Sequence, residues 1–164
     1  MLTPDLDRID RKIVDELQRD GGLSNLDLSE RVGLSPSPCL RRVKQLEDAG
    51  IIRRRVTLMD QEALGLSLTV FIQVSLGNQV PGMLEHFEET VVDFPEVLEC
   101  SLVTGSDADY LIKAVIPDMS HYERFLLREL NQIDGVSHIR TSFALRRVVN
   151  RTELPLTHLV TRPA

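Results

Sequence analysis

The chain has 164 residues, of which 42% are hydrophobic and 27% are charged, a composition typical of a globular protein with one medium or two small domains. No apolar run approaches the roughly 18 to 20 residues that span a bilayer, and the acidic, polar N-terminus is unlike a secretory signal, so we expect a cytoplasmic protein with no membrane partner. Acidic residues outnumber basic ones by 25 to 19, a formal net charge of −6. Cys39 and Cys100 form no CxxC pair, so we expect two reduced thiols.

The acidic charge is unevenly distributed along the chain. Residues 1–56 carry a net charge of +1, whereas residues 57–164 carry −7. Residues 36–55 contain six basic and two acidic side chains, a local net charge of +4. Because such a stretch attracts phosphates and acidic surface repels them, the distribution predicts that the N-terminal part contacts nucleic acid and that the rest is held away from it.

Three short helices are predicted at the start of the chain. Apolar residues recur at three- and four-residue steps over residues 5–19, which indicates an amphipathic helix. Ser24 is a suitable N-cap for a second helix that ends at Gly33, and Ser35 or Ser37 is a suitable N-cap for a third. Two helices joined by a tight turn, the second of them cationic, are typical of a helix-turn-helix, whose second helix enters the major groove of DNA.

The third helix carries most of the residues that we expect to contact DNA. Leu40, Val43 and Leu46 are predicted to face the core, which places Arg41 at the centre of the opposite side. Arginine and lysine contact phosphates and guanine, glutamine pairs with adenine, and the amides that begin the second helix can hold a phosphate. The predicted DNA-binding residues are Ser24, Asn25, Ser37, Pro38, Arg41, Arg42, Lys44, Gln45 and Arg53, with Arg42 and Lys44 assigned to phosphates.

Two alternatives to this interpretation remain open from the residues alone. A three-helix bundle with a solvated basic face would show the same pattern of helices and charges. Arg42 in particular could pair with an acidic neighbour such as Glu30 instead of a phosphate. Residues 51–58 are predicted to be extended and to form a wing beside the helices.

After a linker at residues 59–66 the pattern changes from helical to alternating. Strands are predicted over residues 68–76, 97–104, 110–116 and 136–149, and helices over residues 81–94 and 120–133, the latter capped by Ser120. The order βαββαβ is that of a ferredoxin-like fold. We therefore predict an α+β protein with domains at residues 1–58 and 67–150 and a C-terminal tail at residues 151–164.

The loop from Thr104 to Tyr110 is the second candidate site. A glycine-bearing loop offers free amides that can hold a carboxylate, and a nearby Asp can hold an ammonium group, so the loop suits an α-amino acid. Gly, Ser and Asp are also the usual residues of a hairpin turn, which is the alternative. The four histidines share no metal-ligand spacing and no nucleotide-binding glycine motif is present, so we expect neither an enzyme nor a metal protein.

At these residues the chain resembles the leucine-responsive/asparagine-C (Lrp/AsnC) family of feast/famine transcription regulators, over nearly its whole length. The run SPSPCLRRVKQLE is similar to the leucine-responsive branch itself. The matching segments are LDRIDRKIVDELQRDG (6–21), LSERVGLSPSPCLRRVKQLEDAGII (28–52), LVTGSDADYLIKAVIPDMSHY (102–122) and GVSHIRTSFAL (135–145).

The resemblance implies an N-terminal winged helix-turn-helix joined to a ferredoxin-like effector domain of the RAM type. It implies homodimers that pair through their sheets, assemble further into octamers and bind double-stranded DNA. An amino acid such as leucine or methionine, and no other cofactor, would bind between effector domains. The implied ligand-binding residues are Thr104, Gly105, Ser106, Asp107, Asp109, Tyr110, Met119, Thr141 and Ser142.

Two other functions known for this kind of fold remain as alternatives to a regulator. Sirohaem decarboxylases resemble the family but bind a substrate with several carboxylates, which the net charge of −7 on residues 57–164 disfavours. An architectural DNA-compacting protein would respond to no amino acid. The apolar segment 154–164 is predicted to pack on its own or a neighbouring effector domain, and nucleoid association is expected.

Overall fold

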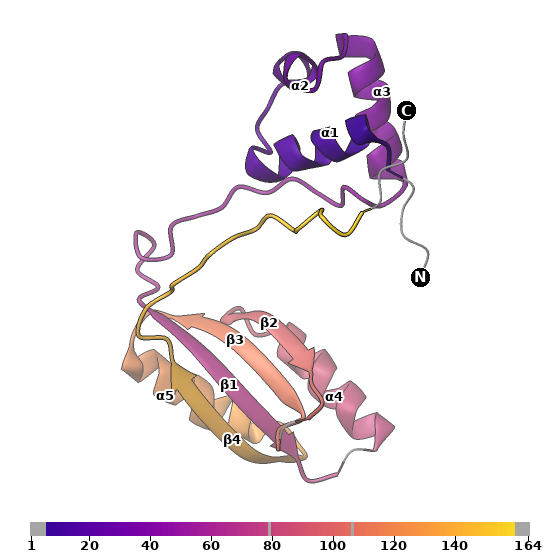
Figure 1. Cartoon of the computed structure of the whole chain (residues 1–164). Coiled ribbons are helices and arrows are strands. Elements are labelled where there is room, and N and C mark those ends of the chain that lie inside the picture. The colour runs from indigo at the N-terminus through magenta and orange to yellow at the C-terminus, as the bar shows by residue number, and fades with distance from the viewer. Residues whose placement is uncertain (1–5, 79, 106, 160–164) are drawn as a thin grey trace. The chain divides into compact units, whose positions relative to one another are not determined.

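The computed structural model describes residues 6–78, 80–105 and 107–159, which form two compact units. One unit, the helical unit, contains the described residues up to Leu58 together with those from Val149 onward. The other, the sheet unit, spans Met59–Val148. Figure 1 shows the helices and strands of both units. Each unit has its own hydrophobic core. No helix in the described residues is both long and apolar enough to cross a membrane.

The helical unit consists of α1 (Arg8–Arg19), α2 (Asn25–Val32) and α3 (Pro36–Asp48). The predicted cap Ser24 begins α2, and Gly33 ends it with a left-handed φ of 78°, a conformation that glycine adopts without strain. Ser35, and not Ser37, precedes α3. The fully or almost fully buried hydrophobic side chains of the unit are Leu6, Ile13, Leu28, Val32, Cys39, Val43, Leu46 and Leu159.

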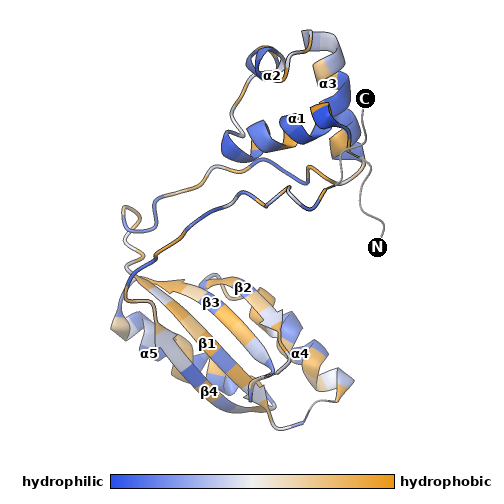
Figure 2. Cartoon of the chain, in the orientation of Figure 1, coloured by the Kyte–Doolittle hydropathy of each residue, from blue (hydrophilic) through white to orange (hydrophobic). Residues whose placement is uncertain are grey.

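The sheet unit has the predicted βαββαβ order. Its elements are β1 (Leu68–Leu76), α4 (Pro81–Val92), β2 (Val97–Leu102), β3 (Tyr110–Ile116), α5 (Met119–Arg128), a 3₁₀ turn (Leu130–Gln132) and β4 (Val136–Phe143). The strands are antiparallel in the order β2-β3-β1-β4, and both helices contribute to the core on one face of the sheet. Figure 2 shows hydrophobic residues along the central strands β1 and β3.

The predicted boundaries of α5 and β4 are wrong. Helix α5 ends at Arg128 instead of residue 133. Asp118, and not Ser120, caps α5, because its carboxylate accepts a hydrogen bond of 2.7 Å from the His121 amide. Strand β4 ends at Phe143 instead of residue 149. Its neighbour β1 begins at Leu68, so beyond the bond from Ala144 to Thr69 there is no partner strand left to pair with.

The C-terminal tail packs on the helical unit, which contradicts the prediction that it packs on an effector domain. Leu159 is 7% exposed and belongs to the helical core, and Leu156 packs against the same core. Three short helices bury a small core, and apolar side chains from elsewhere in the chain can add to it.

Candidate functional site

One side of α3 faces solvent and carries four of the nine predicted DNA-binding residues. Cys39, Val43 and Leu46 form the buried stripe, so side chains about half a helical turn away point outward. The exposed side chains of the outer face are Ser37, Leu40, Arg41, Lys44 and Gln45, with Asp48 at its C-terminal end. Neither Arg41 nor Lys44 takes part in an ion pair within the described residues. Both cations are therefore available to a polyanion.

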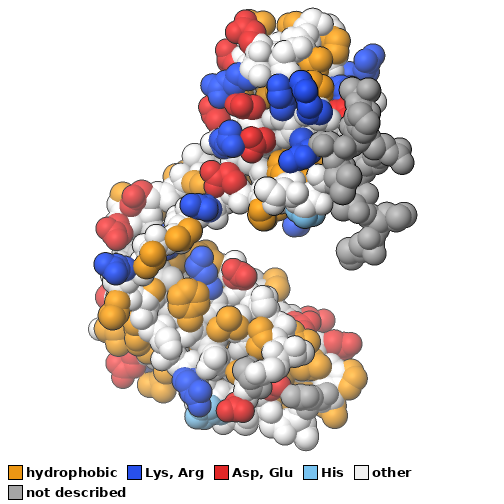
Figure 3. All heavy atoms as spheres, in the orientation of Figure 1, with side chains coloured by type: hydrophobic (Ala, Val, Ile, Leu, Met, Phe, Trp, Pro, Cys, Tyr) orange, Lys and Arg blue, Asp and Glu red, His pale blue; other side chains and the backbone are white. Residues whose placement is uncertain are grey.

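The presence of basic side chains alone does not distinguish the outer face of α3 from the rest of the helical unit. Figure 3 shows Lys and Arg side chains interspersed with Asp and Glu over the helical unit. Several of these cations are neutralised locally, such as Arg31 by Glu16 at 3.1 Å and Arg19 by Asp15 at 2.9 Å. Arg41 and Lys44 differ from Arg31 and Arg19 in having no ion-pair partner within the described residues, and both lie on the outer face of α3.

Leu40 is exposed on the outer face, although the apolar pattern of α3 predicts that it faces the core. Its side chain is 58% exposed, while Cys39 is fully buried. The stripes 39/43/46 and 40/43/46 have nearly the same helical spacing, and leucine is more apolar than cysteine, so the pattern favoured the wrong residue. Leu40 lies one helical turn from Ser37 and next to Arg41, where an apolar side chain can contact a thymine methyl group.

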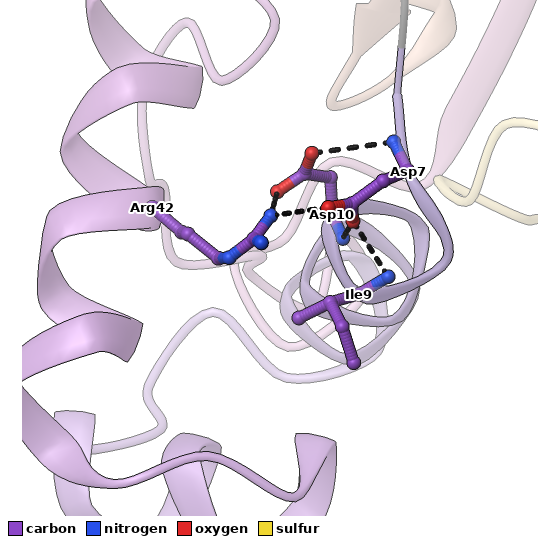
Figure 4. A network of polar contacts seen from close by, with 4 residues as sticks. All are labelled: Asp7, Ile9, Asp10 and Arg42. Carbon is purple, nitrogen blue, oxygen red and sulfur yellow. Dashed lines mark hydrogen bonds and ion pairs between the residues drawn. The ribbon is translucent and has the colours of Figure 1, made fainter. Parts of the chain in front are cut away.

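Arg42 is partly buried between α3 and the start of α1, away from the outer face of α3. One guanidinium nitrogen, Nη1, donates hydrogen bonds of 2.7 Å to both Asp7 Oδ2 and Asp10 Oδ1 (Figure 4). The same two aspartates form the capping box of α1, in which each side chain accepts from the other's backbone amide. Arg42 thus fastens α3 to the start of α1, which replaces both the predicted phosphate contact and the alternative pairing with Glu30.

This network makes the helical unit sensitive to acid. Burial raises the pKa of the Asp7 carboxyl, but the amides of Asp10 and Ile9 and the Arg42 guanidinium outweigh it, so the pKa lies below its ordinary value. A lowered pKa means that the unfolded chain binds this proton more tightly than the folded one does. The stabilisation is therefore complete above the ordinary carboxyl pKa of about 4 and is lost as pH falls through the lower folded value.

We expect Arg42→Gln to lower the free energy of unfolding of the helical unit by about 1 kcal/mol at pH 7, a modest value because water screens this partly exposed network. The difference from the unaltered protein should shrink as the pH falls below about 4. Urea denaturation followed by circular dichroism at pH 7 and pH 3 measures both effects. Arg41→Gln is the matched control, one residue along the same helix, and an equal loss of stability there would refute the assignment.

The start of α2 is built to hold the turn that precedes α3. Ser24 Oγ accepts from the Asp27 amide at 3.1 Å and donates to its carboxylate at 2.6 Å. Asn25 Nδ2 donates to the Pro36 carbonyl at 2.9 Å, which ties the first turn of α2 to that of α3. The Ser24 hydroxyl and Asn25 Nδ2 are thus occupied structurally, whereas Asn25 Oδ1 is buried without a hydrogen-bond partner among the described residues. The predicted role of the two backbone amides in holding phosphate stays a prediction.

The remaining predicted DNA contacts lie at the two ends of α3. Pro38 is half-buried in the first turn. Arg53 is exposed in the segment after α3. Residues 51–58, the predicted wing, form no hydrogen-bonded strand among the described residues.

The loop between β2 and β3 is held tightly against the end of β1. Gly105 has a φ of 84°, which turns the chain. Asp109 Oδ2 accepts from the Leu76 amide at 2.7 Å, and the Asp107 carbonyl accepts from Ser75 Oγ at 2.9 Å. The Asp107 side chain is exposed, whereas the Asp109 carboxylate already serves the backbone of β1. Asp107 is therefore the more accessible anion of the loop.

Tyr110, predicted to bind ligand, is a core residue. It is 1% exposed, its ring centroid lies 4.5 Å from that of Phe87, and its hydroxyl donates to Glu88 Oε1 at 2.7 Å. Burial raises the pKa of its hydroxyl. As the first inward-facing residue of β3, Tyr110 anchors the loop from below instead of presenting its own hydroxyl to a ligand.

A single chain does not bring the other predicted ligand residues together. Thr104 and Gly105 are exposed in the loop before β3, whereas Met119 follows the far end of that strand, about 20 Å away for a seven-residue strand. Thr141 and Ser142 lie near the C-terminal end of β4 and, as successive strand residues, face opposite sides of the sheet. Ser106 lies outside the described residues.

Thr141 is the most unusual of these residues. Its Oγ1 is buried on the helix-covered side and has no hydrogen-bond partner in the part of the chain that the structure describes. It borders an open groove of about 530 Å³ between β4 and α5. No cluster of three or more potential metal ligands occurs among the described residues.

Comparison with known proteins places both units in established sequence families. Residues 6–53 match the sequence model of a winged helix-turn-helix DNA-binding domain, and residues 69–154 match that of the Lrp/AsnC ligand binding domain. The leucine-responsive regulatory proteins of Escherichia coli K12 and Klebsiella pneumoniae are each 45% identical over 150 residues, which covers 92% of this chain and 91% of theirs.

Solved structures give the same result. A transcriptional regulator of Neisseria meningitidis in complex with L-Met is 46% identical, with a TM-score of 0.90 over 94% of this chain and 99% of its own. An AsnC family regulator of Agrobacterium tumefaciens is 39% identical, with a TM-score of 0.89 over 94% of this chain and 100% of its own.

Proposed function

The chain belongs to the Lrp/AsnC family of DNA-binding transcription regulators, and on that premise we propose that an amino acid bound between its effector domains controls its assembly and its affinity for DNA. The helical unit is the winged helix-turn-helix DNA-binding domain, and the sheet unit is the effector domain. The relatives are regulators, so the protein is not an enzyme.

The separation of the predicted ligand residues is the observation that carries the proposal. The loop from Thr104 to Asp109 and Met119 lie at opposite ends of β3, so no ligand the size of an amino acid touches both in one chain. A second copy that places its Met119 near the loop of the first would complete the site. A ligand in such a site prefers the assembly that contains it and shifts the equilibrium by that preference alone.

The open face of the sheet supports a homodimer. Phe71 and Leu111 lie on the face that the helices leave uncovered, and they are 40% and 38% exposed. Exposed aromatic and aliphatic side chains on one sheet face are typical of a surface that another subunit covers. We propose that dimers formed through this face assemble further, up to an octamer, and that several DNA-binding domains then act together through a high effective concentration.

The ligand is proposed to be a small apolar amino acid such as leucine or methionine. The exposed Asp107 carboxylate suits its ammonium group, and amides of the glycine-bearing loop suit its carboxylate. A relative of 46% identity forms a complex with L-Met, which supports this class. No further cofactor is proposed, and the protein is expected to act on DNA in the cytoplasm, in association with the nucleoid.

A screen of the twenty amino acids against the full-length protein tests the proposal. A ligand present at about 100 times its Kd should stabilise the effector domain by about 2.7 kcal/mol, seen as a higher melting temperature. The same amino acid should change the molar mass measured by light scattering and the affinity for genomic DNA fragments. If no amino acid changes melting, mass or DNA affinity, the protein is instead an architectural DNA-binding protein.

A further inference from the structure

The C-terminal segment from Leu154 to Leu159 is an integral part of the DNA-binding domain. The Leu159 side chain is 7% exposed and lies in the same core as Ile13 of α1. Leu156 packs against this core, and the Leu159 amide donates to the Leu156 carbonyl at 3.2 Å, which turns both side chains inward. The tail thus supplies apolar contacts that the three helices do not provide themselves.

Polar contacts fix the segment along α1. The side-chain amide of Gln18 bonds both backbone groups of Leu154, accepting from its N–H at 2.7 Å and donating to its C=O at 3.3 Å. Two helical turns earlier, Arg11 Nη1 donates to the Leu159 carbonyl at 3.2 Å. The segment is therefore held at both of its ends by side chains of one helix.

The two leucines at the ends of this segment have different roles. Leu154 is bound through its backbone, and its side chain is 72% exposed, whereas Leu159 is bound through its buried side chain. The segment is recognised by its backbone at one end and by an apolar side chain at the other. This difference supplies a matched pair of positions for substitution.

The path of the chain gives this docking a regulatory consequence. The effector domain, Met59–Val148, is inserted between two parts of the DNA-binding domain, which the chain leaves after Leu58 and re-enters at Val149. Two covalent connections therefore join the domains, and β4 of the effector domain leads into the second of them. A single connection lets a domain swivel freely, whereas two connections at different points restrict it.

We propose that residues 154–159 act as a strap that completes the DNA-binding domain and transmits the state of the effector domain to it. Docked, the strap holds α1, to which Arg42 of α3 is fastened, in the arrangement that presents Arg41 to DNA. Undocked, it leaves a domain with an incomplete core and one connection to the effector domain. The claim about DNA rests on the proposed function, while the claim about the fold does not.

Hydrogen exchange of the full-length protein tests the structural claim. In Leu159→Ala, amides of α1 around Ile13 should exchange at least about tenfold faster, because a buried leucine is lost from a small core. Leu154→Ala, the matched control, should exchange like the unaltered protein, and amides of β1 and β3 should be unchanged in both. If α1 keeps its protection in Leu159→Ala, or if β3 loses protection instead, residues 154–159 do not complete the DNA-binding domain and the proposal is wrong.

Operator affinity, measured with and without the amino acid, tests whether the strap transmits the state of the effector domain. Gln18→Ala removes both side-chain bonds to Leu154 without opening the core, so the domain should stay folded while the amino-acid effect on operator affinity falls by at least about half. An unaltered ligand effect in a folded Gln18→Ala protein would refute transmission and leave the strap as a purely structural element. If the unaltered protein itself shows no amino-acid effect, the proposed function fails. The hydrogen-exchange result still tests whether residues 154–159 complete the DNA-binding domain.

Discussion

Replacing Arg41 with Ala should weaken binding to the operator by about 1–3 kcal/mol per DNA-binding domain, or roughly 5- to 150-fold. Arg41 lies at the centre of the outer face of α3, is exposed and has no acidic partner among the described residues. An arginine in this position can donate two hydrogen bonds to a guanine in the major groove. Gel shift at a fixed salt concentration, with specific and scrambled DNA, measures the loss and its sequence dependence.

Arg31→Ala is the control for this experiment. It removes the same charge from the same domain, but Arg31 lies on α2 and is paired with Glu16. We expect Arg31→Ala to change affinity for specific and scrambled DNA equally and only slightly. If Arg41→Ala behaves in the same way, Arg41 contacts phosphate or nothing, and base reading belongs to its neighbours on the outer face. In an octamer several domains bind together, so the loss per assembly should exceed the loss per domain.

Replacing Asp107 with Ala should abolish the amino-acid response and leave DNA binding without ligand unchanged. Removing a charged partner from a ligand ammonium group costs about 1.5–3 kcal/mol, or roughly 10- to 150-fold in Kd. Among the described residues, Asp107 is bonded through its backbone, its carbonyl accepting from Ser75 Oγ, so the fold should survive the loss of the side chain. Calorimetry with the amino acid found in the screen gives the Kd, and gel shift with and without it gives the response.

Two variants make this result specific. Asp93→Ala removes another exposed carboxylate, which follows α4 and so precedes β2 while the loop follows it, and should behave like the unaltered protein. Asp109→Ala should lower the melting temperature even without ligand, because the Leu76 amide loses its acceptor. If Asp107→Ala keeps normal ligand affinity, the ammonium group is held by another residue and the loop assignment is wrong.

Much of the fold was predictable because its signals are local. Ser24 and Gly33 mark the ends of α2, and the change from helical to alternating periodicity after Gly65 separates the two patterns. The βαββαβ order follows from the same periodicities. Within the site, Ser37, Arg41, Lys44 and Gln45 were assigned correctly to the exposed side of α3, since their helical spacing requires it.

The remaining features depend on contacts distant in sequence. Arg42 bonds residues more than thirty positions earlier, and no local pattern distinguishes it from Arg41. The choice of Cys39 over Leu40 for the core depends on a rotation of α3 that its packing on the other helices sets. The position of residues 154–159 depends on Gln18, which bonds Leu154, and on Arg11, which bonds Leu159. Both lie far from this segment in the sequence.

Because Leu159 belongs to the core of the DNA-binding domain, the ribosome makes one part of that domain before the effector domain and the other part after it. Residues 59–148 must be translated in between, which takes about 5 to 20 s at ordinary elongation rates. A nascent chain therefore holds an incomplete DNA-binding domain while the effector domain is synthesised, and joining residues so far apart in sequence slows folding. The DNA-binding domain cannot complete its core until residues 59–148 have been made.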